Sequence, residues 1–307
     1  MNRRQFLGSS LAAFGTAGCS PTPRDSAASK PASPQPHAYH LRYAPRIGLL
    51  EGLSVPEQLE LYAQHGFRAF EYNGLPQNHS LEEAATFRKQ MDDLKMEMGV
   101  FVVNSGGWKG DALVDKKFHE GFLKDVRKAV EYHKVMRNKW ATVTSGLSVN
   151  YLSPTQQTQN VIEGLRRAAE VVAGTDLTLV LEPLNVLVSH PGYFVVTSPH
   201  AAEIVDAVGS PHVRILFDIF HQQISEGNLI NNFLQHWDRI AYFQAGDVPG
   251  RNEPGTGEIN YRNVFKAIHA KGYEGIIGME HGLSRPGMEG LLKCFEEYRA
   301  ADTWDEA

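Results

Sequence analysis

The fold of this chain is decided by the stretch Leu177-Thr178-Leu179-Val180-Leu181-Glu182, an apolar run that ends in a carboxylate. Three later runs repeat the pattern and end in Asp218, Gln244 and Glu280. Burying a lone carboxylate costs several kcal/mol even after the surroundings relax, and no Lys or Arg stands next to any of these run ends in the sequence. Three acids and one amide that converge from four strands therefore predict a shared divalent cation bound by oxygen.

Length, composition and charge limit the number of domains and the kinds of partner that this protein can have. The chain has 307 residues, of which 42% are hydrophobic, enough for one large core or two small ones. Its formal net charge of −5 argues against a nucleic-acid partner, because such proteins usually carry a basic face. Two cysteines, Cys19 and Cys294, provide neither a disulfide framework nor a thiolate metal cluster.

Short apolar runs alternate with longer amphipathic segments from Arg46 onward. We expect strands at 46–50, 68–72, 98–104, 140–145, 177–182, 213–218, 240–244 and 275–280, and helices at 56–65, 81–94, 116–133, 155–173, 199–208, 222–236, 261–271 and 287–299. Near-continuous apolar strands joined by helical crossovers indicate a parallel sheet covered on both faces. Eight such units predict a (β/α)8 TIM barrel, and no Gly-rich phosphate fingerprint follows the first strand, which argues against a dinucleotide-binding fold.

A barrel would bring the four polar run ends together, because residues at the carboxyl ends of its strands face the active-site mouth. If the acids point inward, the alternate residues Leu179, Leu181, Ile277 and Met279 point toward the helices, and all four are apolar. Oxygen donors without thiolate suit Mg²⁺ or Mn²⁺. The sequence leaves the choice among Mn²⁺, Mg²⁺ and Co²⁺ open. Four protein oxygens would leave about two of six octahedral positions for water or substrate.

The first residues are typical of an export signal. Arg3-Arg4-Gln5-Phe6-Leu7 resembles the twin-arginine signal, and the apolar stretch after it is too short to span a bilayer. Thr16-Ala17-Gly18-Cys19 resembles a bacterial lipobox, so Cys19 is the expected lipidation site. A plain cleavable signal with an incidental cysteine is the alternative. We expect an exported protein, either periplasmic or anchored to the membrane by lipid.

The chain is thus expected to have four parts. Residues 1–19 form the signal, and residues 20–44 form a linker whose Pro, Ser and Ala cannot bury enough surface to fold, so it is expected to be disordered. The barrel is expected over 45–301, and a short C-terminal tail over 302–307.

The stretch from Phe243 to Tyr261, FQAGDVPGRNEPGTGEINY, strongly resembles the hydroxypyruvate isomerase family. So do Leu181-Glu182-Pro183-Leu184-Asn185, Phe217-Asp218-Ile219-Phe220-His221-Gln222, and Asn104 with Gly107-Trp108. That family belongs to the xylose-isomerase-like barrels, and the resemblance covers residues 46–301. The chain departs from the family's pattern around the substrate mouth, at 46–52 and at Gly106-Gly107-Trp108, so the substrate stays open.

The resemblance implies a role for each matched residue. Glu182, Asp218, Gln244 and Glu280 would ligate one divalent cation. Glu182 and Glu280 would also act as an acid/base pair, which moves a proton between neighbouring carbons of a hydroxy-carbonyl substrate. His221 would donate a hydrogen bond to the substrate; a buried structural histidine is the alternative.

Further pocket residues are expected around this centre. Arg251 lies in a Gly- and Pro-rich loop, where its fork of donors can bind a carboxylate or hydroxyl, or else order the loop. Asn185 and Asn104 are further substrate-binding candidates. Trp108 would supply an apolar wall or lid, against the alternative of simple packing.

Several functions use such a site. The first is a metal-dependent isomerase that interconverts a hydroxy-ketone and a hydroxy-aldehyde through an enediolate. A sugar 3-epimerase with the same glutamates is the nearest alternative, and an inactive exported sugar-binding lipoprotein is another. An apurinic-site endonuclease would need a histidine-rich cluster of three metals, and Gln244 stands where that family has a histidine. The expected partner is a small hydroxy-carbonyl or sugar, with a homo-oligomer left open.

Overall fold

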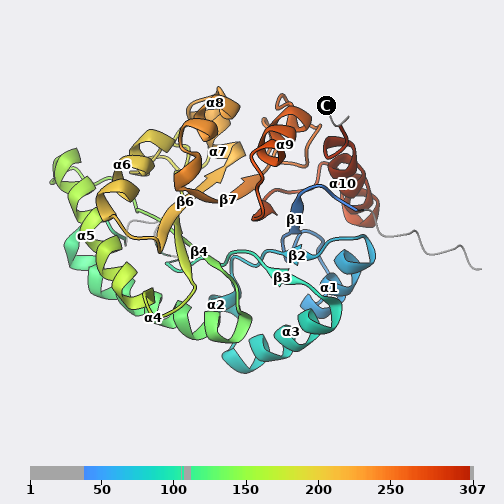
Figure 1. Cartoon of the computed structure of the whole chain (residues 1–307), viewed down its shortest axis with the longest axis horizontal. Coiled ribbons are helices and arrows are strands. Elements are labelled where there is room, and N and C mark those ends of the chain that lie inside the picture. The colour runs from blue at the N-terminus through green and yellow to red at the C-terminus, as the bar shows by residue number, and fades with distance from the viewer. Residues whose placement is uncertain (1–37, 105, 107–111, 305–307) are drawn as a thin grey trace, which may run out of the picture. The chain divides into compact units, whose positions relative to one another are not determined.

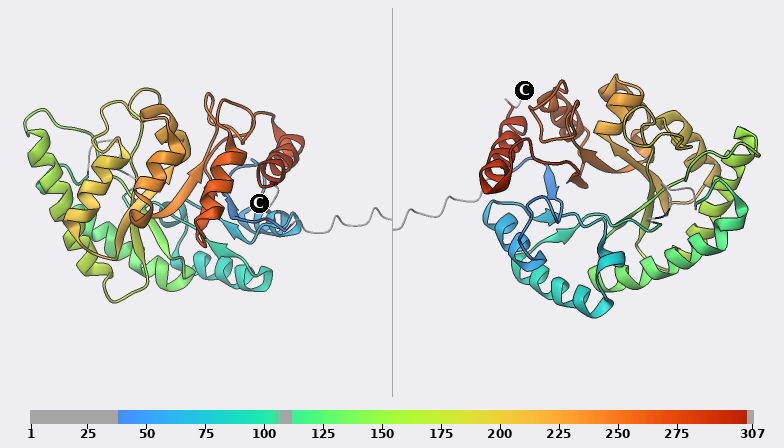
Figure 2. Two further views of the ribbon diagram at one scale, coloured as in Figure 1. Left: turned by 45° about the horizontal axis from the view of Figure 1, so that its top comes forward. Right: turned by 180° about the vertical axis from the view of Figure 1, so that it is seen from behind.

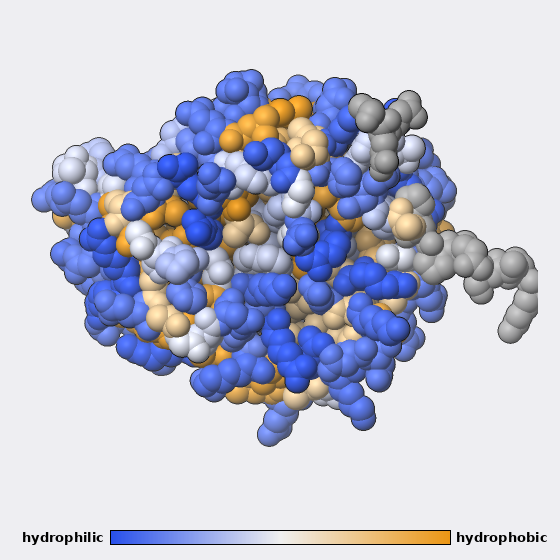
Figure 3. All heavy atoms as spheres, in the orientation of Figure 1, coloured by the Kyte–Doolittle hydropathy of each residue, from blue (hydrophilic) through white to orange (hydrophobic). Residues whose placement is uncertain are grey.

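The computed structural model describes residues 38–104, 106 and 112–304 (Figure 1). The predicted signal, Cys19, Trp108 and most of the predicted linker lie outside these residues. Within them, no helix combines the length and the apolar character that crossing a membrane requires. The face seen in Figure 3 is mainly hydrophilic, with hydrophobic residues in separate groups.

Eight short parallel strands make up the centre of the described chain. They are β1 (Arg42–Pro45), β2 (Ala69–Phe70), β3 (Glu97–Met98), β4 (Trp140–Val143), β5 (Thr178–Leu181), β6 (Val213–Asp218), β7 (Ile240–Ala245) and β8 (Ile276–Met279). Six of them form a sheet in the order β1-β8-β7-β6-β5-β4, and β2 pairs with β3. Two isolated parallel bridges, Arg46 with Glu71 and Val102 with Thr142, join the two sheets at both edges and close the barrel.

Helices surround the strands on the outside of the barrel (Figures 1 and 2). They are α1 (Val55–Gln64), α2 (Leu75–Asn78), α3 (Leu81–Leu94), α4 (His119–Met136), α5 (Pro154–Val172), α6 (Ser198–Val208), α7 (Ile219–Ser225), α8 (Leu229–Gln235), α9 (Tyr261–Ala270) and α10 (Gly287–Ala301), with 3-10 turns at Lys116–Phe118 and Trp237–Arg239. Ser54 and Ser80 cap α1 and α3 through reciprocal capping boxes. Ser153 caps α5 in the same way. The predicted TIM barrel is confirmed.

Three elements differ from the sequence-based expectation. The first strand was expected at 46–50, but β1 is Arg42–Pro45 and so begins before the expected barrel start at 45. Gly48 has a φ of +84°, which an extended strand cannot contain, so the apolar run after Arg46 is a turn. The helix expected at 222–236 is divided into α7 and α8, because Gly227 and Asn228 both adopt positive φ. The third strand is shorter than expected, with a single bridge at Val102 continuing it.

Two buried clusters separate the inside of the barrel from its outside. The smaller cluster takes one residue from each of seven strand segments: Ala44, Ala69, Val100, Val180, Leu216, Tyr242 and Ile276. The larger cluster contains the alternate strand residues Leu179, Leu181, Ile277 and Met279 together with residues of the helices. These four side chains therefore point toward the helices, as predicted. Because side chains alternate along a strand, the residues two positions after the inner ones also face inward, at the carboxyl-end rim. These are Arg46, Glu71, Val102, Glu182, Asp218, Gln244 and Gly278.

Candidate active site

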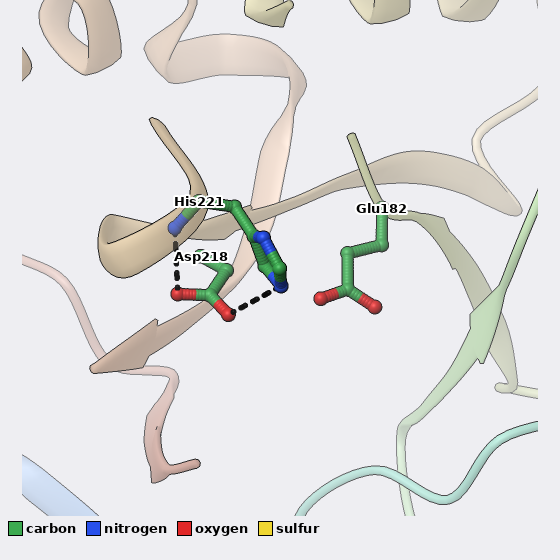
Figure 4. A group of neighbouring side chains, drawn as sticks. All are labelled: Glu182, Asp218 and His221. Atoms are coloured by element: carbon green, nitrogen blue, oxygen red, sulfur yellow. Dashed lines mark hydrogen bonds and ion pairs between the residues drawn. The ribbon is translucent and has the colours of Figure 1, made fainter. Parts of the chain in front are cut away.

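Three polar side chains meet at the rim of the barrel on the β5–β6 side. Glu182 follows β5, Asp218 ends β6, and His221 lies in the first turn of α7. One donor atom of each lies within 4.8 Å of the others, and all three side chains are buried. Figure 4 shows the Glu182 carboxylate pointing toward His221 and Asp218 across a small gap. Asp218 also accepts the backbone N–H of Phe220 at 2.8 Å, so the same carboxylate caps α7.

Glu182 is the acid of the site whose carboxylate has the fewest hydrogen bonds and ion pairs with the described residues. Its residue is only 6% exposed, yet its carboxylate makes no hydrogen bond or ion pair with any residue that the structure describes. Buried carboxylates are normally hydrogen-bonded or paired, because desolvating an unpaired charge is costly. Burial, followed by the charges of Glu280 and Asp218, raises the pKa of Glu182 well above its ordinary value. This carboxyl group is therefore available for a ligand or for a proton.

Arg251 supplies a positive charge to two of the acids. Its Nη2 donates to Oδ2 of Asp218 and to Oε2 of Glu280, both at 2.9 Å, so these two oxygens are separated by no more than twice that distance. Its Nε donates to the backbone carbonyl of Glu280, and its guanidinium lies 4.8 Å from the ring centre of Phe220. Asp218 and Glu280 have no basic neighbour in the sequence, but the β7–α9 loop folds back and provides one in space.

The β7–α9 loop is shaped by the fully buried Asp247. Its carboxylate accepts the backbone N–H groups of Val248, Gly255, Gly257 and Ile259 at 2.8 to 3.1 Å. Its backbone carbonyl also accepts the N–H of Arg251, which has a φ of +52°. The dense Gly and Pro content of this motif therefore has a structural reason: one carboxylate organises the turn that delivers the Arg251 side chain to the rim.

Two further polar groups hold the β7–β8 side of the rim. Nε2 of Gln244 donates to Oε1 of Glu71 at 2.6 Å, whereas Oε1 of Gln244 is buried without a hydrogen-bond partner in the described chain. Nδ2 of Asn73 donates to Oε1 of Glu280 at 2.8 Å. Glu280 is thus held by Asn73 and Arg251, in contrast to the unpartnered Glu182.

Negative charge is crowded at this rim. Burial and the neighbouring Glu280 raise the pKa of Glu71 well above its ordinary value. Burial, partly offset by Arg251, raises the pKa of Asp218 to about 6. Burial by itself lowers the pKa of Arg251, but Glu280, Asp218 and Glu182 outweigh burial and raise it. Like charges in a low-dielectric site disfavour joint ionisation, so added positive charge would stabilise the ionised acids.

His221 has a defined tautomer. The backbone N–H of Asn185, which can only donate, lies 3.2 Å from Nδ1 of His221, and Nδ2 of Asn185 lies 2.7 Å from the same nitrogen. Nδ1 is therefore an acceptor, and in the neutral ring Nε2 carries the hydrogen. Burial, followed by Arg251 and His190, lowers the pKa of His221 well below 6.5, so the ring is neutral. Nε2, 3.5 Å from Oδ2 of Asp218, is a hydrogen-bond donor rather than a metal ligand.

Of the three predicted ligand acids, Glu182 and Asp218 have donor atoms within 4.8 Å of each other and of His221, whereas Glu280 is not part of this group; the rim nevertheless offers the oxygen donors that a hard divalent cation needs. The amide oxygen of Gln244 is buried without a partner among the described residues, and no described residue uses the carboxylate oxygens of Glu182, a residue that is 6% exposed. Asp218 and Glu280 have partners on their oxygens, but a carboxylate has about four lone-pair sites and can accept more than two contacts. Carboxylate and amide oxygens are the ligands that Mg²⁺ and Mn²⁺ prefer.

The remaining sequence-predicted residues are placed as follows. Asn104 is buried, and its amide is paired with the backbone N–H and carbonyl of Thr144, both at 3.0 Å. Asn185 binds His221 and also accepts the N–H groups of Val188 and Ser189. Trp108 lies outside the described residues. The substrate-binding roles of these three residues remain predictions.

Sequence reasoning missed Arg46, Glu71 and Asn73. Glu71 carries the same signal as the four recognised run ends, because Ala69-Phe70-Glu71 is an apolar run that ends in an acid. The apolar part of this run has only two residues, which is too short to be a distinctive signal. The sequence pattern predicts Arg46 at the start of a strand, whereas in the barrel it directly follows the end of β1.

Residues 59–298 match the family model of the xylose isomerase-like TIM barrel. The chain is 32% identical to hydroxypyruvate isomerase of Escherichia coli (strain K12) over 264 residues, which cover 84% of this chain and 100% of the relative. It is 30% identical to 2-oxo-tetronate isomerase of Cupriavidus necator, across 71% of this chain and 84% of the relative.

Solved structures have the same fold. A protein from Brucella melitensis described as an AP endonuclease of family 2 superposes with a TM-score of 0.74 and 26% identity, covering 82% of this chain and 96% of its own. A 3-keto-D-glucoside 4-epimerase from E. coli superposes with a TM-score of 0.72 over 85% of this chain and 99% of its own. At 18% identity, the second likeness shows the fold alone.

Proposed function

Because this chain belongs to the xylose isomerase-like TIM barrel family and is an isomerase of that superfamily, we propose that it interconverts a hydroxy-ketone and a hydroxy-aldehyde by proton transfer between two glutamates. The observation that carries this proposal is the contrast between Glu182 and Glu280. Glu182 is buried without a partner among the residues that the structure describes, whereas Glu280 is held by Arg251 and Asn73. Two carboxyl groups in different environments at one rim suit the roles of acid and base.

The reaction moves two protons and no electrons to or from an outside reagent. The base removes the proton from the carbon that bears the hydroxyl group, which leaves an enediolate. The same proton, or one from solvent, is then delivered to the neighbouring carbon that carried the carbonyl. A second proton passes from the hydroxyl oxygen to the former carbonyl oxygen, so atoms balance. We assign the carbon proton transfers to Glu182 and Glu280.

We further propose that Glu182, Asp218, Gln244 and Glu280 hold one divalent cation, Mn²⁺ or Mg²⁺. When bound, this ion supplies positive charge beside the substrate's oxygens, which lowers the cost of the negative charge that develops there. The amide oxygen of Gln244 and the carboxylate of Glu182, neither of which has a partner in the described part of the chain, support this ligand set. Nε2–H of His221 is proposed to donate to a substrate oxygen, because its tautomer makes it a donor.

The test is product analysis in deuterated water with the purified protein, Mn²⁺ and a panel of hydroxy-carbonyl acids and neutral ketoses. The proposal predicts deuterium at a substrate carbon and a product with the carbonyl moved by one carbon. Glu280→Gln should abolish turnover while substrate analogues still bind. A product that differs only in the configuration at one carbon would identify a 3-epimerase instead. A protein that binds sugars without any deuterium exchange would be a binding lipoprotein, and the isomerase proposal would be lost.

Export is a separate proposal, supported by Arg3-Arg4 and by the lipobox-like Cys19. Cell fractionation would test it. We expect Arg3→Lys with Arg4→Lys to retain the protein in the cytoplasm, and Cys19→Ala to release it from the membrane fraction. Identical fractionation of all three forms would contradict both roles.

A further inference from the structure

Arg46 contributes a basic residue to a rim that is otherwise mainly acidic. It directly follows β1, and its backbone bridges Glu71 on the neighbouring segment. Ala44, two residues earlier, belongs to the inner cluster of the barrel, so Arg46 faces inward as Glu182, Asp218 and Gln244 do. The β1 position of the inward-facing rim is thus occupied by a permanent positive charge.

The guanidinium of Arg46 is anchored but not neutralised. Its Nε donates to the backbone carbonyl of His281 at 2.9 Å, and the backbone carbonyl of Arg46 accepts from the hydroxyl of Tyr62 at 2.9 Å. Among the residues that the structure describes, none accepts a hydrogen bond from either Nη atom of Arg46, and no carboxylate lies within ion-pair distance. Arg251 differs in this respect, because its Nη2 already binds the carboxylates of Asp218 and Glu280.

Arg46 lines the same cavity as the proposed acid/base residue. This cavity, of about 430 Å³, is lined by Arg46 together with Asn73, Arg251, Glu280 and His281. Asn73 and Arg251 hold the Glu280 carboxylate on this wall, so its oxygens already have partners. An anion in the cavity can therefore bind both Nη groups of Arg46, which no described residue uses.

We propose that Arg46 is an anion subsite that binds the carboxylate of the substrate and makes the enzyme prefer hydroxy-oxo acids to neutral ketoses. This inference rests on the proposed function, since it names the substrate class of the same site. A guanidinium with one edge held by a backbone carbonyl is pre-organised, and its remaining N–H groups match the two oxygens of a carboxylate. A neutral substrate would leave these donors without a charged partner.

The decisive comparison uses two substrates that differ only at one end. Hydroxypyruvate and dihydroxyacetone have the same hydroxymethyl ketone, but the first carries a carboxylate where the second carries a hydroxymethyl group. Arg46→Met removes the charge and keeps an unbranched side chain. We expect it to raise KM for hydroxypyruvate by about ten- to hundredfold, as the loss of a charge-assisted contact implies, with kcat and the constants for dihydroxyacetone little changed. Arg46→Lys should restore part of the loss.

Arg42→Met is the matched control. Arg42 lies on the same strand, but its side chain pairs with Glu97 and with the backbone carbonyl of Glu274 on the exposed surface. It should leave both substrates unaffected. Equal losses for the acid and the neutral substrate in Arg46→Met, or no loss for the acid, would overturn the proposal.

A binding measurement separates this inference from the proposed function. D-Glycerate carries the carboxylate but no carbonyl, so it binds without reacting, and glycerol is its neutral counterpart. We expect calorimetry to show binding of D-glycerate that Arg46→Met weakens. If wild-type protein exchanges no deuterium into either ketone but shows this Arg46-dependent binding, the isomerase proposal fails and the anion subsite stands. If both ketones turn over and Arg46→Met leaves their ratio unchanged, the isomerase stands and the subsite fails.

Discussion

The side-chain nitrogen of Gln244 donates a hydrogen bond of 2.6 Å to Oε1 of Glu71, and this contact fixes the direction of the Gln244 amide oxygen. Glu71 is itself fixed, because its Oε2 accepts a hydrogen bond from the hydroxyl of Tyr242 at 3.1 Å. The same oxygen lies so close to Gly278 that a Cβ at that position would be only 1.7 Å away. Gly278 thus makes room for the carboxylate of Glu71. The pair keeps an amide oxygen buried and unpartnered, ready to accept a ligand.

We predict that Glu71→Ala lowers the affinity for Mn²⁺ by about ten- to hundredfold, because residues that orient metal ligands typically have effects of this size. Glu71→Gln should bind Mn²⁺ nearly as the wild type does, since its amide oxygen can still accept from Gln244. Titration calorimetry with MnCl₂ measures both. Glu97→Ala, which removes an exposed acid from the pair with Arg42, is the control. Equal affinities for Glu71→Ala and Glu71→Gln would contradict the orienting role.

His221 should act on the substrate and not on the cation. Because Nδ1 accepts from the backbone of Asn185, Nε2 keeps its hydrogen and cannot ligate a metal. We expect His221→Gln to reduce kcat/KM by roughly ten- to hundredfold, the effect of one lost hydrogen bond of about 1–3 kcal/mol, with the Mn²⁺ affinity unchanged. His200→Gln, at a half-buried histidine bonded to Thr158, should change neither quantity. A large loss of Mn²⁺ affinity in His221→Gln would show that the ring is a ligand.

We predict that Asp247 contributes far more to the free energy of unfolding than an aspartate on the surface does. Asp247→Ala leaves four backbone N–H groups of a buried loop without their acceptor, so we expect the free energy of unfolding to fall by about 3 kcal/mol or more. Asp206 forms a two-point ion pair with Arg239, but its side chain is 55% exposed. Asp206→Ala should cost no more than about 1 kcal/mol. Urea denaturation compares the two, and similar losses would refute this account of the loop.

The buried tyrosines predict a loss of stability at alkaline pH. Burial raises the pKa of Tyr39 to about 12, and burial is also the first cause of the raised pKa values of Tyr43, Tyr62, Tyr273 and Tyr298. The unfolded chain loses these phenolic protons from about pH 10, whereas the folded chain keeps them. The free energy of unfolding is therefore unaffected well below pH 10 and decreases above it, by up to about 1.4 kcal/mol per pH unit for each group.

An ultraviolet titration of tyrosinate with parallel circular dichroism measures this effect. Most of the tyrosinate absorbance should appear together with loss of the folded signal, at a pH above 10. If the tyrosines ionise near pH 10 while the circular dichroism stays native, their burial does not control the titration.

The barrel and its rim could be read from the sequence because both depend on local, repeating patterns. Apolar runs of strand length, separated by amphipathic segments, predicted eight units, and alternation within 177–182 and 276–280 predicted the inner and outer faces. The start of β1 could not be read in this way, since Ile47–Leu50 is as apolar as a strand and only the positive φ of Gly48 ends it.

The contacts across the rim could not be predicted from local patterns. Arg251 and Asp218 are 33 residues apart, and Gln244 and Glu71 are 173 residues apart, so only the closed barrel brings each pair together. The tautomer of His221 likewise depends on a backbone N–H from a different strand end. The sequence predicts which side chains carry the chemistry, and the fold determines which of their atoms have partners among the described residues.

The most direct test of the central claim is a crystal structure of the protein soaked with MnCl₂, with an anomalous difference map collected for manganese. We predict one peak at the rim, with oxygens of Glu182, Asp218, Gln244 and Glu280 within about 2.0–2.6 Å. The Glu71–Gln244 hydrogen bond should be preserved in that structure. A manganese peak that uses Nε2 of His221 in place of Gln244, or a rim without any peak at saturating Mn²⁺, would contradict the proposed centre.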